Sequence, residues 1–550
     1  MKSWAKLIII IVAALVLVYW FAGNKIYEFA ILKLVAVRAK PAAPNHAVVW
    51  EKGPGTAATP INERPPNIIL ILADDLGYND LTINGGGVAD GAVPTPHIDS
   101  LAKEGVTFVN GYANNATCAP SRAAMMTGRY ATRFGFEFTP TPIQFPKVIH
   151  RIDPDRTLYH PELEKECPPY QDMGVPPEEI TIAELLKEKG YRTLMLGKWH
   201  LGESAGLQPG DQGFDEWLGF YAGATLFLPK DDPQAVNARL DWDPIDKFLW
   251  ANLIYHIVED GGERFQPKGY LTDYLTDEAV RAIEANKNRP FFMFLSHAAV
   301  HTPLQASKSD YDALPQIEDH GLRVYGGMIR ALDRGVGRVL QALKDHGLEE
   351  NTLVIFTTDN GGAGYIGLPD INKPYRGWKA TFFEGGLHAP FFMKWPQGLP
   401  QGATYDQPVA HFDIFATVAG AAGIPLPADR DMDGTDLMPY IKGEQQGSPH
   451  EVLFWESGHY RSVLAGGWKL QTAERPKQDW LFNLDQDPTE QVNLARQKPR
   501  KVAELKSLLA EHEKEKARPI WPSLIEGLFG IDHPTNIPLG KGDEYVYWPN

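Results

Sequence analysis

The stretch Ile68-Ile-Leu-Ile-Leu72 runs directly into Asp74 and Asp75, and it sets the pattern for most of the chain. A continuous apolar run of this length is typical of a strand that is buried on both faces, as in a parallel sheet. Later segments repeat the design, in which an apolar run leads into polar side chains. They are residues 192–196 before Lys198 and His200, residues 291–295 before His297 and His301, and residues 353–356 before Asp359 and Asn360.

Helical patterns lie between these apolar runs. Thr181 and Glu184 form a capping box. Residues 276–286 are compatible with a helix, and apolar spacing over 328–343 predicts another, which Gly347 can end. Alternating strands and helices predict an α/β fold with a large, mostly parallel sheet that has helices on both faces. Ligands of such sheets bind at the carboxyl ends of the strands, where the polar clusters fall.

The composition changes after about residue 443, where short aromatic and aliphatic segments predict an antiparallel sheet. The expected strands are residues 452–455, 461–464, 468–470 and 480–482, and a charged helix follows at 499–516. We expect a smaller second domain there. The predicted division is a signal or anchor at 1–40, a Pro-, Ala- and Gly-rich linker at 41–66, a catalytic α/β domain at 67–445, an antiparallel subdomain at 446–518 and a tail at 519–550.

The charge and the N-terminus limit the choice of partner and compartment. The chain of 550 residues has a formal net charge of -16, which argues against nucleic acid as an electrostatic partner. An anionic substrate would therefore need a local group of cations. Residues 7–23 are an uncharged stretch at the short limit for a membrane span. Its aromatic end and the lack of a small-x-small cleavage site favour an anchor over a cleaved signal, and either one exports the chain, to a periplasm or another outward-facing space.

A second informative stretch is Cys118-Ala-Pro-Ser-Arg-Ala-Ala-Met-Met-Thr-Gly-Arg129. Pro120 and Ser121 suit the entry to a helix. A cysteine at a helix N-terminus beside Arg122 sits in a positive field, which favours an anionic or nucleophilic centre. From composition alone, Cys118 could instead form a disulfide with Cys167, the only other cysteine of the sequence.

Hard oxygen donors follow two of the predicted strands, namely Asp74, Asp75, Asp359 and Asn360. Adjacent buried carboxylates repel each other and need a cation or another partner. Oxygen-only donors suit calcium or magnesium rather than zinc. The alternative is that Asp74 and Asp75 only cap the segment that follows them.

The twelve residues from Cys118 to Arg129 closely resemble the signature of the type I sulfatases, and the resemblance extends from about Asn67 to the end of the smaller domain. It implies the alkaline-phosphatase-like fold and hydrolysis of a sulfate ester. It also implies that a formylglycine-generating enzyme oxidises Cys118 to an aldehyde. One hydroxyl of the hydrated aldehyde would attack sulfur and displace the alcohol, and deprotonation of the other would expel sulfate.

The resemblance also implies a metal site and the roles of several residues. One divalent ion, usually calcium and alternatively magnesium, would be held by the oxidised Cys118 together with the four oxygen donors named above. Two further blocks, Gly197-Lys-Trp-His-Leu-Gly202 and residues 376–386, would supply Lys198 and Lys379 to bind sulfate and His200 to hold the hydrated aldehyde. Taken alone, each is more often an exposed lysine or a packed histidine.

The remaining implied roles concern proton transfer and charge. Arg122 would hold the hydrate, His301 would protonate the leaving alcohol, and Asp359 would take a proton from the hydrate. We expect His297 to be a packed histidine. One departure is His388, which stands where related sequences often have arginine, and this puts in doubt any anion contact or pairing made there.

The sequence is also compatible with two other functions. Related formylglycine enzymes hydrolyse phosphonate monoesters or phosphodiesters. The second alternative is a membrane-tethered protein that binds glycans and has no catalytic activity. The substrate is a sulfate ester of a small molecule or a glycan. Long loops at 140–170 and 226–269 are expected to form the walls of its pocket.

Overall fold

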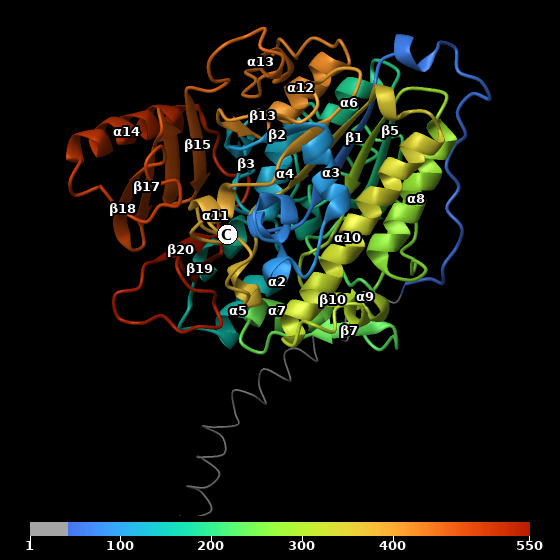
Figure 1. The fold of residues 1–550 in the computed structure, drawn as a ribbon. Helices are drawn as coiled ribbons and strands as arrows, with labels where there is room; N and C mark the ends of the chain where they lie inside the picture. Colours follow the sequence, from blue (N-terminus) through green and yellow to red (C-terminus); the bar gives the residue numbers. More distant parts are fainter. Residues whose placement is uncertain (1–41) are drawn as a thin grey trace, which may run out of the picture.

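The computed structural model describes residues 42–550, so the expected signal or anchor at 7–23 lies outside the described residues. Its centre is a nine-stranded mixed sheet (Figure 1), with the order β13-β2-β12-β11-β1-β9-β5-β6-β8. These strands are β1 (Asn67–Ala73), β2 (Val106–Phe108), β5 (Arg192–Lys198), β6 (Glu216–Phe220), β8 (Val258–Glu259), β9 (Phe291–Ser296), β11 (Thr352–Thr358), β12 (Phe392–Lys394) and β13 (Ala403–Tyr405). The four predicted apolar runs are confirmed as the neighbouring parallel strands β11, β1, β9 and β5.

Strand β1 is buried along its whole length because helices cover both faces of the sheet. Ile69 and Ile71 belong to one hydrophobic core, and Ile68 and Leu70 belong to the other. The first core is covered by α3 (Pro96–Glu104), α8 (Leu271–Asn286) and α10 (His320–Asp345), and the second by α4 (Cys118–Thr127), α6 (Ile182–Lys187) and α12 (Asp413–Ala421) (Figure 1). The α/β fold with helices on both faces is thus confirmed.

The predicted antiparallel sheet is also confirmed. Strands β15 (Val452–Ser457), β16 (Tyr460–Ala465), β17 (Trp468–Glu474) and β18 (Lys477–Asn483) pair in sequence order, and α14 (Pro499–His512) packs on the sheet. Figure 1 shows this unit at one side of the main sheet. Its helix ends a few residues before the predicted boundary at residue 516.

The segments that flank the two sheets pack against them. Val48 and Trp50, in the expected linker, are buried in the main core, and Nε1 of Trp50 donates to Glu278 at 2.9 Å. The expected tail contains β19 (Ile525–Gly530) and β20 (Tyr545–Pro549), which form a small sheet with β4 (Thr157–Tyr159). Trp548 of β20 is buried in a cluster with residues of both larger units. The tail is therefore part of the folded body.

The two long loops expected at the pocket are more regular than predicted. The first contains α5 (Gln144–Ile152) and β4, and the second contains β7 (Ala235–Ala238), α7 (Pro244–Asn252) and β8. The missed signal for α7 was Asp243-Pro244, because the Asp243 side chain accepts from the amide of Asp246 at 3.0 Å and proline suits the first helical turn.

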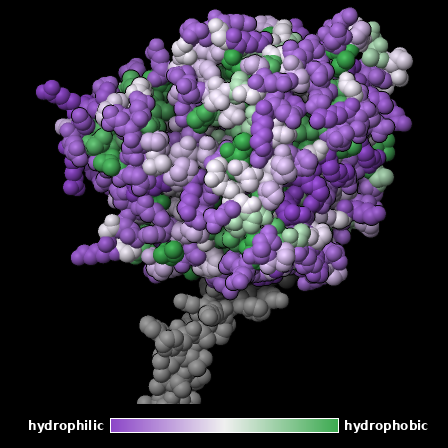
Figure 2. Space-filling view, viewed as in Figure 1, coloured by the Kyte–Doolittle hydropathy of each residue, from purple (hydrophilic) through white to green (hydrophobic). Residues whose placement is uncertain are grey.

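The outer surface agrees with a core held between the layers. The face in Figure 2 is mainly hydrophilic, with hydrophobic residues in small groups. Over residues 42–550, none of the helices is both long enough and apolar enough to cross a membrane.

Candidate active site

The carboxyl ends of β1 and β11 bring the predicted oxygen donors together. These strands are parallel neighbours and stay in register to their last residues. Asp74 and Asp75 follow β1, and Asp359 and Asn360 follow β11, so all four side chains lie at one edge of the sheet. Each of them is at most 3% exposed. The amide of Asp75 donates to Oδ1 of Asp359 at 3.3 Å and ties the two strand ends together.

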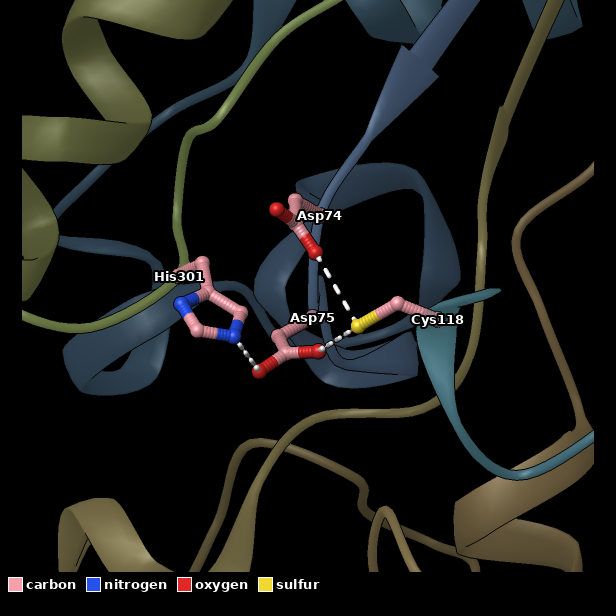
Figure 3. Close-up of side chains that lie close together, drawn as sticks. All are labelled: Asp74, Asp75, Cys118 and His301. Atoms are coloured by element: carbon pink, nitrogen blue, oxygen red, sulfur yellow. Dashed lines mark hydrogen bonds and ion pairs between the residues drawn. The ribbon is translucent and has the colours of Figure 1, made fainter. Parts of the chain in front are cut away.

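Cys118 is the first residue of α4 and lies beside this cluster (Figure 3). Its Sγ is 3.5 Å from Oδ1 of Asp74 and 3.7 Å from Oδ1 of Asp75. Cys118 and Cys167 are both free thiols, so the disulfide alternative is wrong. The sulfur thus occupies the position at which an oxidised side chain would meet the oxygen donors.

The environment of the thiol differs from the sequence-based expectation. Burial raises the pKa of Cys118 well above its usual range, and the charge of Asp359 raises it further. The lysines nearby act in the opposite direction but do not compensate. The expected positive field at the helix N-terminus therefore does not produce a thiolate, and the unmodified side chain stays protonated at neutral pH.

Buried cations face the carboxylates across the site. Each predicted cation has its own carboxylate partner, and all three side chains are nearly or fully buried. The pairs are Arg122 Nε with Asp359 Oδ2 at 2.8 Å, Lys198 Nζ with Asp74 Oδ2 at 2.7 Å, and Lys379 Nζ with Asp75 Oδ1 at 2.7 Å. Lys379 also lies 3.2 Å from the sulfur of Cys118. An acidic protein thus gathers three buried cations at one point, where each is balanced by a carboxylate.

The oxygen donors fit a divalent cation. Burial raises the pKa of Asp74 to about 7 even though Lys198 lies beside it. The ionised form of this carboxylate is therefore disfavoured unless a further cation binds. The buried Oδ1 of Asn360 has no hydrogen-bond partner among the described residues and remains free to bind a ligand. Ligand atoms of Asp74, Asp75, Cys118 and His301 all lie within 4.8 Å of one another.

Two predicted histidines complete the cluster. Nε2 of His301 lies 3.6 Å from Oδ2 of Asp75 (Figure 3). Its Nδ1 lies 2.6 Å from the carbonyl of Thr302. Burial lowers the pKa of His301 to about 3. His200 follows β5 with a positive φ of 63°, and its buried Nδ1 lacks a hydrogen-bond partner among the described residues. Burial and neighbouring cations hold the pKa of His200 well below its usual range.

Other residues of the site were not predicted from the sequence. The hydroxyl of Tyr365 donates to Oδ2 of Asp75 at 2.9 Å and accepts from Lys379 at 3.3 Å. The hydroxyl of Ser296 accepts from Nη1 of Arg122 at 2.6 Å. Ser296 ends β9, and this position at a strand end was the signal that could have identified it. Tyr365 lies in the short 3-10 helix η8 (Gly364–Ile366), which does not directly follow a strand, and it offers no such signal.

Two histidines lie outside the cluster. Both ring nitrogens of the buried His297 lack hydrogen-bond partners in the described part of the chain, and the ring packs near Gly335 of α10. His388 has Nδ1 at 2.9 Å from Oε2 of Glu384 and Nε2 at 2.6 Å from the carbonyl of Val109. The sequence puts in doubt any anion contact or structural pairing at this position, and in the structure His388 pairs internally with Glu384 and Val109.

The cluster opens into a cavity of about 310 Å³. Cys118, His200, His301, Tyr365 and Lys379 line one end of it. A cavity of this volume is at the lower end of the range for sites that bind small organic ligands.

Known proteins are similar to this chain in sequence and in fold. The Sulfatase family matches residues 66–424, and the family described as N-sulphoglucosamine sulphohydrolase, C-terminal, matches residues 376–517. The N-acetylgalactosamine-6-sulfatase of Mus musculus is 34% identical over 416 residues, which cover 74% of this chain and 72% of the relative. The steryl-sulfatase of Homo sapiens is 34% identical over 503 residues, which cover 77% of each chain. The solved structure of Ps i-CgsB in complex with k-i-k-neocarrahexaose is 30% identical, with a TM-score of 0.70 over 83% of this chain and 95% of the other.

The match to the Sulfatase family spans more than half of the chain and includes every predicted catalytic and metal-binding residue. The relatives above are sulfatases by name and are similar over most of their length. Sulfate ester hydrolysis is thus supported over the phosphonate and glycan-binding alternatives. The chain belongs to the sulfatase family of the alkaline phosphatase superfamily and is a sulfuric ester hydrolase.

Proposed function

We propose that this chain cleaves its sulfate ester with Cys118 in the oxidised, formylglycine form. The observation that carries this proposal is the position of the buried Sγ of Cys118, which lies 3.5 Å from Oδ1 of Asp74, 3.7 Å from Oδ1 of Asp75 and 3.2 Å from Nζ of Lys379. Burial raises the pKa of the thiol at this position. A protonated thiol is a poor nucleophile. A hydrated aldehyde at the same position would supply one hydroxyl to attack sulfur and a second whose deprotonation releases sulfate.

The oxygen cluster would hold one divalent cation. Asp74, Asp75, Asp359 and Asn360 offer oxygen atoms only, which favours calcium, with magnesium as the alternative. The unpartnered Oδ1 of Asn360 and the crowded carboxylates support this assignment. When bound, the cation would polarise the sulfate group and lower the pKa of the attacking hydroxyl.

The buried cations would bind and orient the sulfate group. Arg122 is fixed by Asp359 and Ser296 before any substrate arrives, and its Nη2 has no hydrogen-bond partner among the described residues. Lys198 is held by Asp74, and Lys379 is held by Asp75. Charges that are fixed in advance stabilise the negative charge that develops in the transition state without further reorganisation.

The two histidines of the cluster would bind the hydrate and transfer a proton. His200 would hold the hydrate, and His301 would protonate the leaving alcohol. His301 is neutral in the substrate-free site because burial lowers its pKa. A sulfate anion beside the ring favours the imidazolium and raises that pKa, so the acid would form once the substrate is bound. Asp359, whose pKa is held at about 2 by Arg122 against the cost of burial, would accept the proton of the hydrate only transiently.

The proposed chemistry implies a substrate class and a maturation partner, and the N-terminal sequence implies a compartment. The substrate is a sulfate ester of a small molecule or a glycan, and a formylglycine-generating enzyme would mature Cys118. The apolar stretch at 7–23 supports an exported protein whose catalytic body faces a periplasm or the outside of the cell, with an N-terminal membrane anchor. We retain the predicted catalytic domain at 67–445 and the subdomain at 446–518.

The proposal is tested by the mass of the peptide that contains Cys118, after expression in a host that performs the conversion. Oxidation to the aldehyde lowers the mass by about 18 Da. The modified protein should hydrolyse 4-nitrophenyl sulfate and turn over a 4-nitrophenyl phosphodiester far more slowly. An unmodified thiol in fully active protein would contradict the mechanism, and a faster phosphodiester reaction would contradict the substrate class.

A further inference from the structure

The cavity beside Cys118 has two ends of different character. The catalytic residues line one end, and the other is walled by α5, α7 and β19. Ile149 of α5, Phe248 of α7 and Ile525 of β19 are at most 5% exposed and pack together in one small cluster. Three segments that are far apart in the sequence thus form one apolar wall.

Large apolar side chains of this wall remain partly exposed to the cavity. They are Phe145, Ile245, Leu249, Leu253, Leu528 and Phe529. Apolar surface that converges on one concave site is the usual mark of a site for an apolar ligand, because covering it removes that surface from water.

The charged side chains of the same cavity already have partners within the protein. Both carboxylate oxygens of Asp243 accept amide hydrogens at the start of α7, at 3.2 and 3.0 Å. Nη1 of Arg156 donates to the carbonyl of Thr535 at 3.1 Å, and its Nε lies 3.8 Å from Asp153. A sugar ring needs several unengaged polar groups to replace its bound water. The charged groups at this end are committed to the fold instead. Oγ1 of Thr139 and Nε1 of Trp548 also line the cavity and lack partners among the described residues, but they are outnumbered by the apolar side chains of the wall.

The chain's own C-terminal segment builds part of this wall. Strand β19 pairs with β4, with Gly527 opposite Thr157, and thereby places Leu528 and Phe529 beside α5 and α7. The two matching families end at residues 424 and 517, before β19 begins. The character of the apolar end therefore depends in part on Leu528 and Phe529, which lie beyond both matched ranges.

We infer that the substrate is the sulfate ester of a mainly apolar alcohol, such as an alicyclic, aryl or long alkyl alcohol, rather than of a polysaccharide. This inference rests on the proposed sulfate ester hydrolysis at Cys118. The sulfate group binds among Lys198, Lys379 and Arg122, and the hydrocarbon part lies against α5, α7 and β19.

The test uses the mature enzyme and a series of alkyl sulfates from butyl to octyl sulfate, with galactose 6-sulfate as the sugar probe. Each added methylene that enters the apolar end should raise kcat/KM about threefold to fourfold. Galactose 6-sulfate should react more slowly than octyl sulfate. The linear alcohols should also inhibit 4-nitrophenyl sulfate hydrolysis competitively, with an inhibition constant that falls by the same factor per methylene.

Two wall variants locate the effect. Leu249→Ser and Phe529→Ser should each lower the ratio of kcat/KM for octyl over butyl sulfate about fivefold to tenfold. Val492→Ser is the matched control, because Val492 is 54% exposed and does not line the cavity. It should leave the ratio unchanged. Thermal unfolding of each variant identifies any that fails to fold.

The outcomes separate this inference from the function on which it rests. If protein with oxidised Cys118 does not hydrolyse 4-nitrophenyl sulfate, the proposed function fails. If 4-nitrophenyl sulfate reacts but chain length has no effect, or galactose 6-sulfate is preferred, only the apolar substrate class is overturned. An unchanged ratio in both folded wall variants also overturns it.

Discussion

Replacing Lys469 with methionine should destabilise the protein and disturb the segment that carries Lys379. Lys469 lies in β17 and is fully buried. Its Nζ is 2.6 Å from Oε1 of Glu384 and 3.1 Å from Oε1 of Glu490. Glu384 begins the short helix α11 (Glu384–Leu387), five residues after Lys379. The ion cluster therefore connects the C-terminal sheet to the segment that carries a predicted sulfate-binding lysine.

The magnitude follows from what Lys469→Met leaves behind. Methionine fills most of the volume of the lysine stem, so the loss of packing is small. Two buried carboxylates would remain without the cation that faces both. Breaking a buried ion pair in this way costs about 3–5 kcal/mol of the free energy of unfolding. The distorted α11 should also lower kcat/KM for 4-nitrophenyl sulfate about tenfold or more.

The penalty should depend on pH. Against the cost of burial, Lys469 and His388 lower the pKa of Glu384 to about 2, whereas burial raises the pKa of Glu490 to about 7. The folded pKa of Glu384 lies below its unfolded value, so its stabilising contribution is present above about pH 4.3 and is lost as the pH falls. In the variant both carboxylates would have raised pKa values. Protonation then relieves their repulsion, and the penalty shrinks from about pH 8 to about pH 5.

Chemical unfolding in guanidinium at both pH values measures this penalty as the shift in midpoint. Lys477→Met on the neighbouring strand β18 is the control, because Lys477 is exposed and its replacement should change the free energy of unfolding by less than about 0.5 kcal/mol. A loss below about 1 kcal/mol for Lys469→Met at pH 8, or an equal loss at both pH values, would refute the reasoning.

Three further predictions concern the catalytic cluster. Cys118→Ala should abolish turnover while the thermal midpoint stays within a few degrees of wild type, and turnover at even 1% of the wild-type rate would argue against covalent catalysis. His301→Asn should slow hydrolysis of alkyl sulfates about 10²- to 10⁴-fold but that of 4-nitrophenyl sulfate far less, because nitrophenolate leaves without a proton; equal losses on both substrates would remove the acid role. Chelation with EDTA should lower both activity and the thermal midpoint, and calcium should restore both; activity that survives exhaustive chelation would contradict the metal site.

Much of the fold could be predicted because its signals are local. A buried parallel strand is a continuous apolar run, and the capping box of Thr181 and Glu184 announces the start of α6 within four residues. Several predicted catalytic and metal-binding positions can be located from the same strand pattern. Asp74, Asp359 and Lys198 stand at or directly after the ends of neighbouring parallel strands, so the sheet alone brings them to one edge.

The charge state of Cys118 could not be predicted in the same way. The helix N-terminus and Arg122 are visible in the local sequence and favour a thiolate. The carboxylates that oppose it follow β1 and β11, which are remote from α4 in the sequence, and burial depends on the whole core. A local pattern thus points to Cys118 as the reacting residue, but the burial and the carboxylates that raise its pKa cannot be read from that pattern.

The apolar end of the cavity shows why a catalytic centre is easier to predict than its substrate. Several predicted catalytic and metal-binding groups, among them Asp74, Lys198 and Asp359, stand at or directly after strand ends, where the sheet brings them together. Phe145 and Leu249 instead meet where α5 packs on α7, and the short pairing of β4 with β19 adds Phe529 to them. No periodicity links these residues, and each alone would pass for an ordinary core side chain. Because the wall residues belong to segments other than those that carry the predicted catalytic groups, the walls can change without loss of the chemistry, and substrate choice can therefore rest in part on the C-terminal segment.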